Sequence, residues 1–139
     1  MIVQIFLWLG LALTLFFVVS PARAVAGEAG QGQQLYEKYC SSCHGKDGRG
    51  NGSVSSYLKI KVPDLTLLKR SNKGVYPLAK VMSSIDGSRM VRGHGDTAMP
   101  VWGEVFETEA RKTESAKYPV LTSLLKTQAI AEYIASLQR

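Results

Sequence analysis

Two cysteines and a histidine lie within one short stretch of the chain, in the order Cys40-Ser41-Ser42-Cys43-His44. No other cysteine occurs in the 139 residues. The Cys-x-x-Cys-His pattern is typical of covalent haem attachment, in which each thiol adds to one vinyl group and the histidine approaches the iron from the same side. We therefore predict one haem c, bound covalently through Cys40 and Cys43, with His44 as an iron ligand.

Three other kinds of site also use paired cysteines. A thioredoxin-like redox dithiol would follow a strand in a β-α-β unit, and no such strand pattern precedes Cys40. A structural zinc ion needs four protein ligands, whereas the chain offers two cysteines and one histidine at a suitable spacing. A structural disulfide is the third alternative. The histidine that directly follows the second cysteine favours haem over all three.

The segment that carries the two cysteines is predicted to be helical. From Gly30 onward, the apolar and cysteine side chains recur at helical spacing and share one face: Leu35, Tyr36, Tyr39, Cys40 and Cys43. The helix should end at the stretch that begins with Gly45, where four glycines in eight residues favour a loop. This first helix would deliver Cys40 to the haem.

Three further helices are expected. Asp64 is a plausible N-cap for a short helix over residues 65–68. An amphipathic helix should begin at Pro77 and end at Gly87. The last helix should begin near Pro119 or Val120, with an apolar stripe from Ile130 to Leu137. Residues 93–103 are expected to be irregular and residues 104–117 to form a charged, solvated surface. With no strand pattern, the fold class is all-α.

The chain resembles the class I c-type cytochromes, small helical monohaem electron carriers, over nearly all of its length after the N-terminal segment. Besides the cysteine motif with Gly45, it has Gly32 and Tyr36 eight and four residues before Cys40. A loop that reads His-Gly-Asp-Thr-Ala-Met-Pro-Val-Trp-Gly over residues 94–103 is the third similarity. The resemblance implies a cytochrome c-like fold around one haem, with Gly32 and Tyr36 packed against the C-terminal helix.

The resemblance also implies that Met99, which precedes Pro100, is the sixth iron ligand. His94 in the same loop is the alternative, because bis-histidine ligation is also common and gives a lower reduction potential. Many relatives have Gly-Pro after the glycine-rich stretch, whereas Gly52 is followed here by Ser53. A backbone carbonyl near Pro63 is therefore a candidate acceptor for the ring proton of His44.

The N-terminal residues form a targeting segment. Residues 2–19 are almost continuously apolar and run into Ala22-Arg23-Ala24-Val25-Ala26, which offers small-x-small cleavage patterns. We predict a signal peptide over residues 1–26 and a cytochrome c domain over residues 27–139, located in the periplasm or otherwise exported. The alternative is an uncleaved membrane anchor, since the run approaches the ~20 residues that cross a bilayer.

The chain carries a net charge of +6, from 17 Lys and Arg against 11 Asp and Glu. This positive charge suits binding to redox partner proteins that have an acidic docking face. We expect membrane attachment only if the N-terminal segment is retained. No stripe of alternating basic and aromatic residues indicates nucleic-acid binding. We predict a single-electron carrier rather than an enzyme. The alternatives are the electron-entry haem subunit of a larger periplasmic dehydrogenase or oxidase, and a haem enzyme or gas sensor with a labile sixth ligand.

Overall fold

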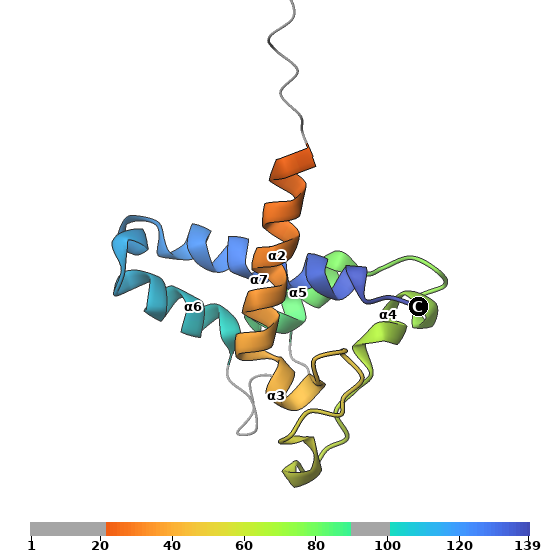
Figure 1. The fold of residues 1–139 in the computed structure, drawn as a ribbon. Helices are drawn as coiled ribbons and strands as arrows, with labels where there is room; N and C mark the ends of the chain where they lie inside the picture. The colour runs from red at the N-terminus through yellow and green to blue at the C-terminus, as the bar shows by residue number, and fades with distance from the viewer. Residues whose placement is uncertain (1–21, 90–100) are drawn as a thin grey trace, which may run out of the picture.

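The computed structural model describes residues 22–89 and 101–139, and every regular element in these two segments is helical (Figure 1). The all-α prediction is therefore confirmed. Most of the predicted signal segment lies outside the described residues, as do the two candidate sixth ligands, His94 and Met99. Among the helices that are described, none is both long and apolar enough to cross a bilayer.

The cysteine motif follows the first described helix. Helix α2 spans Ala22–Tyr39 and is followed directly by the short helix α3, Ser41–His44. Gly32, Tyr36 and Cys40 are buried at successive intervals of four residues, as the helical repeat requires. Leu35 and Tyr39 flank them on the same face and are half-buried. The predicted apolar face of this helix is thus confirmed, although the helix begins well before Gly30.

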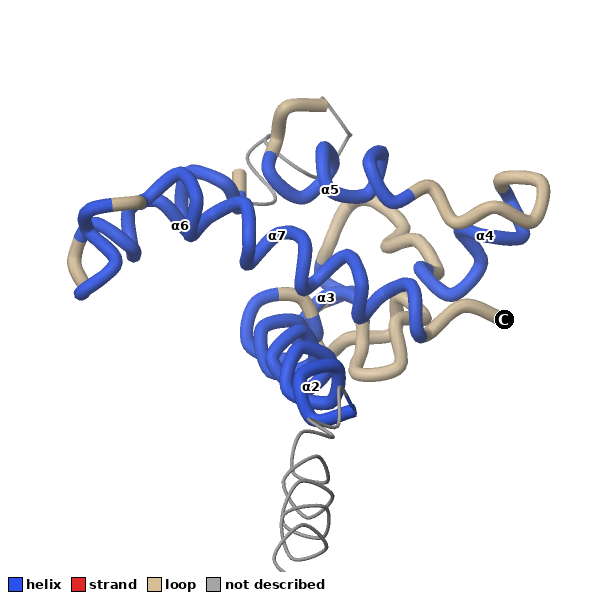
Figure 2. Tube along the Cα trace, turned by 90° about the horizontal axis from the view of Figure 1, so that it is seen from above, coloured by secondary structure: helices blue, strands red, loops and turns tan. Residues whose placement is uncertain are grey.

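The last helix, α7 over Pro119–Ser136, crosses α2 (Figures 1 and 2). The crossing is close because Gly32 has no side chain. A Cβ atom there would collide with the Ala129 carbonyl oxygen and lie 3.1 Å from Tyr133 Cβ. The Tyr36 and Tyr133 rings contact each other beside it in a tilted arrangement, with centroids 5.2 Å apart and an interplanar angle of 53°. The predicted contact between Gly32, Tyr36 and the C-terminal stripe is confirmed.

Helix α5, Leu78–Asp86, packs against α7 and buries Val81 and Ile85. It begins directly after Pro77 and ends at Gly87, whose φ of 84° is the left-handed conformation that glycine adopts without strain. Both predicted boundaries of this helix are confirmed.

Between the cysteine motif and α5 lie short helical turns: η1 at Ser55–Tyr57, η2 at Leu65–Leu67 and α4 at Leu68–Ser71. Asp64 caps η2, as predicted, because its Oδ1 accepts hydrogen bonds from Thr66 N at 2.9 Å and from Thr66 Oγ1 at 2.6 Å.

The expectation of a charged, solvated surface over residues 104–117 holds for only one face of this segment, because its other face is buried. Helix α6 spans Trp102–Arg111 and forms a hairpin with α7 through the turn η3, Glu114–Lys117 (Figure 2). Its inner face buries Gly103, Phe106 and Ala110, and the Phe106 side chain has no solvent exposure. Trp102, also expected in an irregular loop, is the first residue of the helix. The charged residues therefore cover one face of a packed helix.

Candidate haem site

The cysteine motif forms a single tight turn. His44 N and Cys43 N both donate to the Cys40 carbonyl, at 2.9 and 3.2 Å, and Gly45 N donates to Ser41 O at 2.9 Å. The turn places Cys40 and His44 in the interior, where they are 7% and 4% exposed, whereas Cys43 is half-buried. The two thiols are not joined in a disulfide. The side chains of Cys40, Cys43 and His44 therefore all project from one helical turn.

The glycine-rich loop after His44 folds back over this turn. Gly50 N donates to the His44 carbonyl at 2.8 Å and Gly52 N to the Cys43 carbonyl at 3.1 Å. A Cβ atom at Gly52 would collide with the Ser42 carbonyl, so no larger residue fits there without movement of the backbone. Tyr36 adds a hydrogen bond of 2.8 Å from its hydroxyl to the Gly45 carbonyl. The loop and α2 together hold the motif in place.

Cys40 and His44 lie in the wall of a cavity of about 340 Å³. Its other walls come from separate parts of the chain and are mainly apolar: Pro63, Leu65 and Leu68 before α5, Val81 and Ile85 on α5, Trp102 on α6, and Ile134 on α7. The cavity has the volume and the predominantly apolar lining that are usual for sites of organic cofactors.

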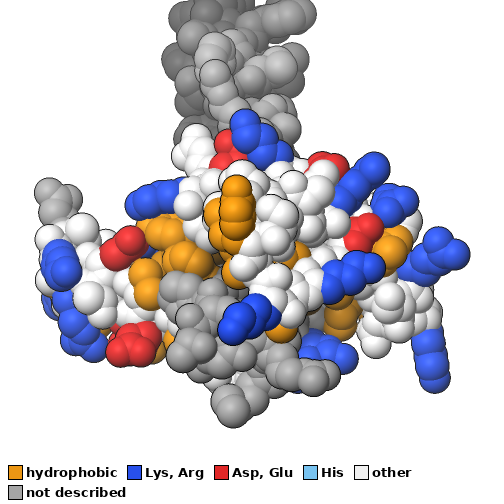
Figure 3. Space-filling view, turned by 90° about the horizontal axis from the view of Figure 1, so that it is seen from below, with side chains coloured by type: hydrophobic (Ala, Val, Ile, Leu, Met, Phe, Trp, Pro, Cys, Tyr) orange, Lys and Arg blue, Asp and Glu red, His pale blue; other side chains and the backbone are white. Residues whose placement is uncertain are grey.

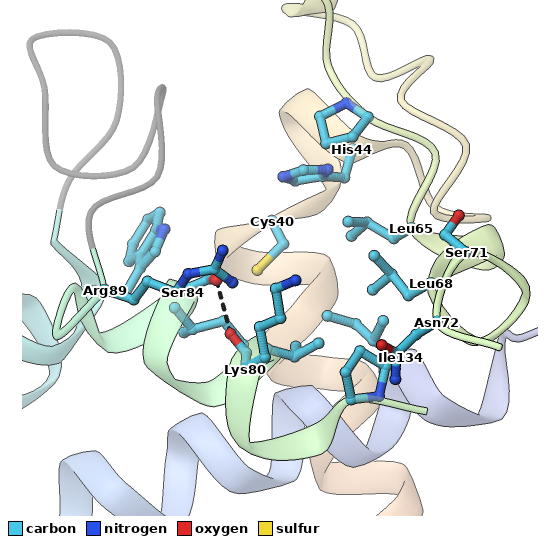
Figure 4. Close-up of a pocket in the computed structure, with 15 residues that line it drawn as sticks. Cys40, His44, Leu65, Leu68, Ser71, Asn72, Lys80, Ser84, Arg89 and Ile134 are labelled. Carbon is cyan, nitrogen blue, oxygen red and sulfur yellow. Dashed lines mark hydrogen bonds between the residues drawn. The ribbon is translucent and has the colours of Figure 1, made fainter. Parts of the chain in front are cut away.

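Besides Cys40 and His44, the cavity is lined by a few polar and charged residues, which are grouped on two of its sides. Figure 4 shows Cys40 and His44 on one wall, Lys80, Ser84 and Arg89 on one side, and Ser71 and Asn72 on another wall. No Asp or Glu is among the lining residues in the part of the chain that the structure describes. Lys80 and Arg89 were not among the predicted site residues, because nothing in the sequence distinguishes them from the other basic residues.

The surroundings of Cys40 do not suit a redox dithiol. Burial, with a smaller contribution from neighbouring Cys43, raises the pKa of the Cys40 thiol to about 12. Reactive thiols of dithiol centres have lowered pKa values, because the thiolate is the nucleophile. The zinc alternative also lacks ligands, since no three His, Cys, Asp or Glu side chains in the described segments are grouped to hold a metal.

The residues of the cavity do fit a haem. A thiol and an imidazole share one wall, and the apolar side chains around them would exclude water from a flat aromatic ring. Trp102 supplies an independent indication, because its buried indole N–H has no hydrogen-bond acceptor among the described residues. A buried donor without an acceptor is costly, and a polar group of a bound cofactor could satisfy it.

The structure places three of the four predicted site residues. Cys40 and His44 line the cavity, and Cys43 lies between them in the sequence. Met99 and its alternative His94 lie outside the described residues. Pro63 lines the same cavity as His44, and a Cβ atom at Gly50 would lie against the carbonyls of Val62 and Pro63. A carbonyl near Pro63 as acceptor for the His44 ring proton stays a prediction.

A helical fold around an apolar cavity, with a Cys-x-x-Cys-His turn in the cavity wall, defines a c-type cytochrome domain. Residues 27–113 match the family described as cytochrome c oxidase, cbb3-type, subunit III. The match covers more than half of the chain, so the chain belongs to this family. Its haem is covalently attached through the cysteines, Cys40 and Cys43, and its role is electron transfer. Comparisons with curated proteins and with solved structures found no match.

Proposed function

We propose that the protein is a single-electron carrier in the periplasm or an equivalent exported compartment, with His44 and Met99 as the axial ligands of its haem. The observation that carries this proposal is the position of His44, which is buried in the wall of the apolar cavity directly beside Cys40. A haem bound there supplies a one-electron couple at its iron. With ligands on both faces, the iron has no open position for a substrate.

The chain's own residues have three tasks in this function. Cys40 and Cys43 retain the cofactor covalently, so it is not lost when partners dissociate. The turn at residues 40–44 orients the His44 imidazole relative to the two thiols. The apolar side chains of the cavity exclude water, which reduces the reorganisation of solvent when charge arrives or leaves. None of these tasks requires a proton transfer or a covalent reaction at a substrate.

Optical spectra of the purified haem protein test the proposal. Oxidised and reduced spectra should show a low-spin haem c, with a weak red absorption band in the oxidised form that is typical of methionine ligation, and added CO should not change the reduced spectrum. Rapid CO binding by the wild-type protein would instead favour an enzyme or gas sensor with a labile sixth ligand. A low-spin spectrum without the red band would favour His94.

We also propose that the carrier docks on acidic surfaces of its redox partners. Lys69 and Arg70 on α4 and Lys73 just after it are exposed, and α4 contributes Ser71 to the cavity wall. Figure 3 shows Lys and Arg side chains around the rim of the face viewed from below, with apolar surface between them. Positive charge near a redox centre attracts anionic partners and speeds encounter.

The rate of oxidation by small inorganic complexes tests this docking charge without an identified partner. Oxidation by an anionic complex such as ferricyanide should slow as salt is added, and oxidation by a cationic cobalt complex should not. Lys69→Gln should reduce the salt effect, whereas Lys112→Gln, at the far end of α6, should leave it unchanged. Equal salt effects for both oxidants would contradict a basic docking face.

One feature favours the second candidate function, that of a haem subunit fixed in a larger oxidase or dehydrogenase. The first half of α7 leaves Val120, Leu121, Leu124 and Leu125 between 48% and 63% exposed. Apolar patches of this kind often mark protein interfaces, and the family description names an oxidase subunit. Purification without detergent, followed by sedimentation, distinguishes the two candidates, because a free carrier remains a monomer at micromolar concentration.

Export depends on residues 1–26, which we propose are removed as a signal peptide. Sequencing of the mature protein from the exported fraction should then give a first residue of Val25 or Gly27. Recovery in the membrane fraction with residues 2–19 retained would instead indicate an anchored form, whose partners are restricted to the membrane surface.

A further inference from the structure

Lys80 and Arg89 line a cavity that is otherwise mainly apolar, and none of the described residues that line it is an Asp or Glu. No ion pair links either cation to an acidic residue in the described segments. A charge at the edge of a cavity loses part of its hydration when the cavity is filled, which is unfavourable unless the ligand brings an opposite charge. These two cations therefore indicate that the occupant of the cavity is anionic at this side.

The turn at the end of α5 sets the position of the Arg89 backbone. Gly87 reverses the chain in the left-handed conformation, and Arg89 N then donates to the Ser83 carbonyl at 2.9 Å. Asp86 Oδ1 accepts a hydrogen bond of 2.7 Å from Ser88 N within the same turn. Arg89 is thus folded back onto the helix that carries Lys80, and the two cations share one side of the cavity.

Figure 4 shows the consequence for the side chains. Lys80 rises from α5 into the cavity toward the wall that carries Cys40, and Arg89 lies next to Ser84 on the same side. The polar residues of the α4 wall, Ser71 and Asn72, carry no charge. Among the described residues that line the cavity, the titratable groups other than these two cations are the Cys40 thiol and the His44 imidazole.

We propose that Lys80 and Arg89 bind the two propionate carboxylates of the haem and thereby raise the reduction potential of its iron. This inference rests on the proposed function. Haem is apolar except at its propionates, so its ring suits the apolar walls and its carboxylates suit the cationic side. Arginine in particular can donate two parallel hydrogen bonds to one carboxylate. Neutralising the propionates favours the reduced iron, which carries one more electron.

The reduction midpoint of the haem protein as a function of pH tests the proposal. The variants are Lys80→Gln, Arg89→Gln and the double variant, with Lys80→Arg as the variant that keeps the charge. Lys112→Gln is the control, because Lys112 is exposed, as Lys80 and Arg89 are, but does not line the cavity. The midpoint is measured by optical titration, so no redox partner is needed. Wild-type protein must give a reversible one-electron transition, and failure there would contradict the proposed function rather than this inference.

The direction of the shift follows from the ionisation of the carboxylates. Free carboxyl groups titrate around pH 4 to 5. Near pH 4 the unpaired propionates of the variants become protonated, and the midpoints should approach that of the wild type. As the pH rises to about 8, these propionates ionise without a cation beside them. The midpoints of Lys80→Gln and Arg89→Gln should then fall below the wild-type value, and the double variant should fall furthest.

Lys80→Arg and Lys112→Gln should follow the wild type throughout this pH range. Midpoints that are unchanged in all variants would overturn the proposal, as would a downward shift of equal size at low and high pH, because that result needs no carboxylate partner. If the double variant does not incorporate haem, the two single variants decide the question, since each keeps one cation.

Discussion

The Tyr39 hydroxyl donates a hydrogen bond of 2.6 Å to Glu109 Oε2, joining the end of α2 to α6 across 70 residues of sequence. Lys126 Nζ on α7 lies 3.0 Å from the same oxygen. One carboxylate thus connects three helices beside the aromatic cluster of Tyr39, Trp102 and Phe106. The hydrogen bond from Tyr39, with a further contribution from Lys126, holds the pKa of Glu109 below its ordinary value of 4.5.

Glu109→Gln should therefore destabilise the protein in a pH-dependent way. A lowered pKa in the folded state means that the stabilisation is present above the ordinary pKa and is lost as the pH falls through the lowered pKa. Because the Glu109 side chain is 38% exposed, solvent screens the interaction and we expect a loss of less than about 1 kcal/mol at pH 7. Urea unfolding at neutral and acidic pH measures it. Glu104→Gln, at an exposed position, should show no such loss, and a loss for Glu109→Gln that is the same at both pH values would contradict the assignment.

Gly32→Ala should destabilise the crossing of α2 and α7. The added Cβ meets the Ala129 backbone and must push the helices apart, and overpacking of this kind typically costs about 1 to 3 kcal/mol. Gly30→Ala is a matched control in the same helix, because a Cβ atom there has open space around it. Alanine is also the better helix former, so this control should be slightly stabilising. Equal unfolding midpoints for the two variants would show that the helices do not cross at Gly32.

Removal of the thiols should separate covalent attachment from simple binding. Cys40→Ala and Cys43→Ala each remove one thioether bond, so each should give much less haem protein when produced with an export and attachment system. The double variant should give no haem stain on a denaturing gel. Ser42→Ala, between the two cysteines, should stain like the wild type. Acid-acetone extraction should release haem only from the double variant, and haem retained there would refute attachment at these residues.

Met99→Ala should leave the haem attached but remove one iron ligand. We expect the red absorption band of the oxidised protein to disappear, the midpoint to fall and the reduced iron to bind CO. The sequence favours Met99 over His94, because proline at position 100 restricts the backbone that follows Met99. His94→Ala should change none of these properties. CO binding by the His94 variant, with an unchanged spectrum for the Met99 variant, would reverse the assignment.

Features that depend on spacing along one helix could be predicted from the sequence. The apolar face from Leu35 to Cys40 and the helix between Pro77 and Gly87 follow from the 3.6-residue repeat and from residues that begin or end helices. The contact of Gly32 with α7 was expected only through resemblance to a family. A glycine in a helix does not by itself reveal what packs against it.

The buried face of helix α6 could not be recognised from overall composition, because five of its ten residues are charged or polar and only a narrow stripe of its surface is apolar. The stripe of Trp102, Val105, Phe106 and Ala110 does have helical spacing, and a search at that period finds it. The sequence around Glu109 is typical of a solvent-exposed residue. Its contacts with Tyr39 and Lys126 arise only from the packing of α2 and α7 against α6. The positions of Lys80 and Arg89 likewise depend on where α5 lies relative to α2.

The burial of Cys40 has a consequence for the order in which the molecule is assembled. Cys40 directly follows the first described helix, α2, whereas α7, which packs against α2, comes from the opposite end of the described chain. Once α7 has docked, a thiol that is 7% exposed and protonated at neutral pH is poorly placed to react with a vinyl group. The thioether bonds should therefore form while the chain is still open. Haem attachment would then precede tertiary folding. A chain that folded before it received haem would bury the Cys40 thiol, one of the two thiols that must react.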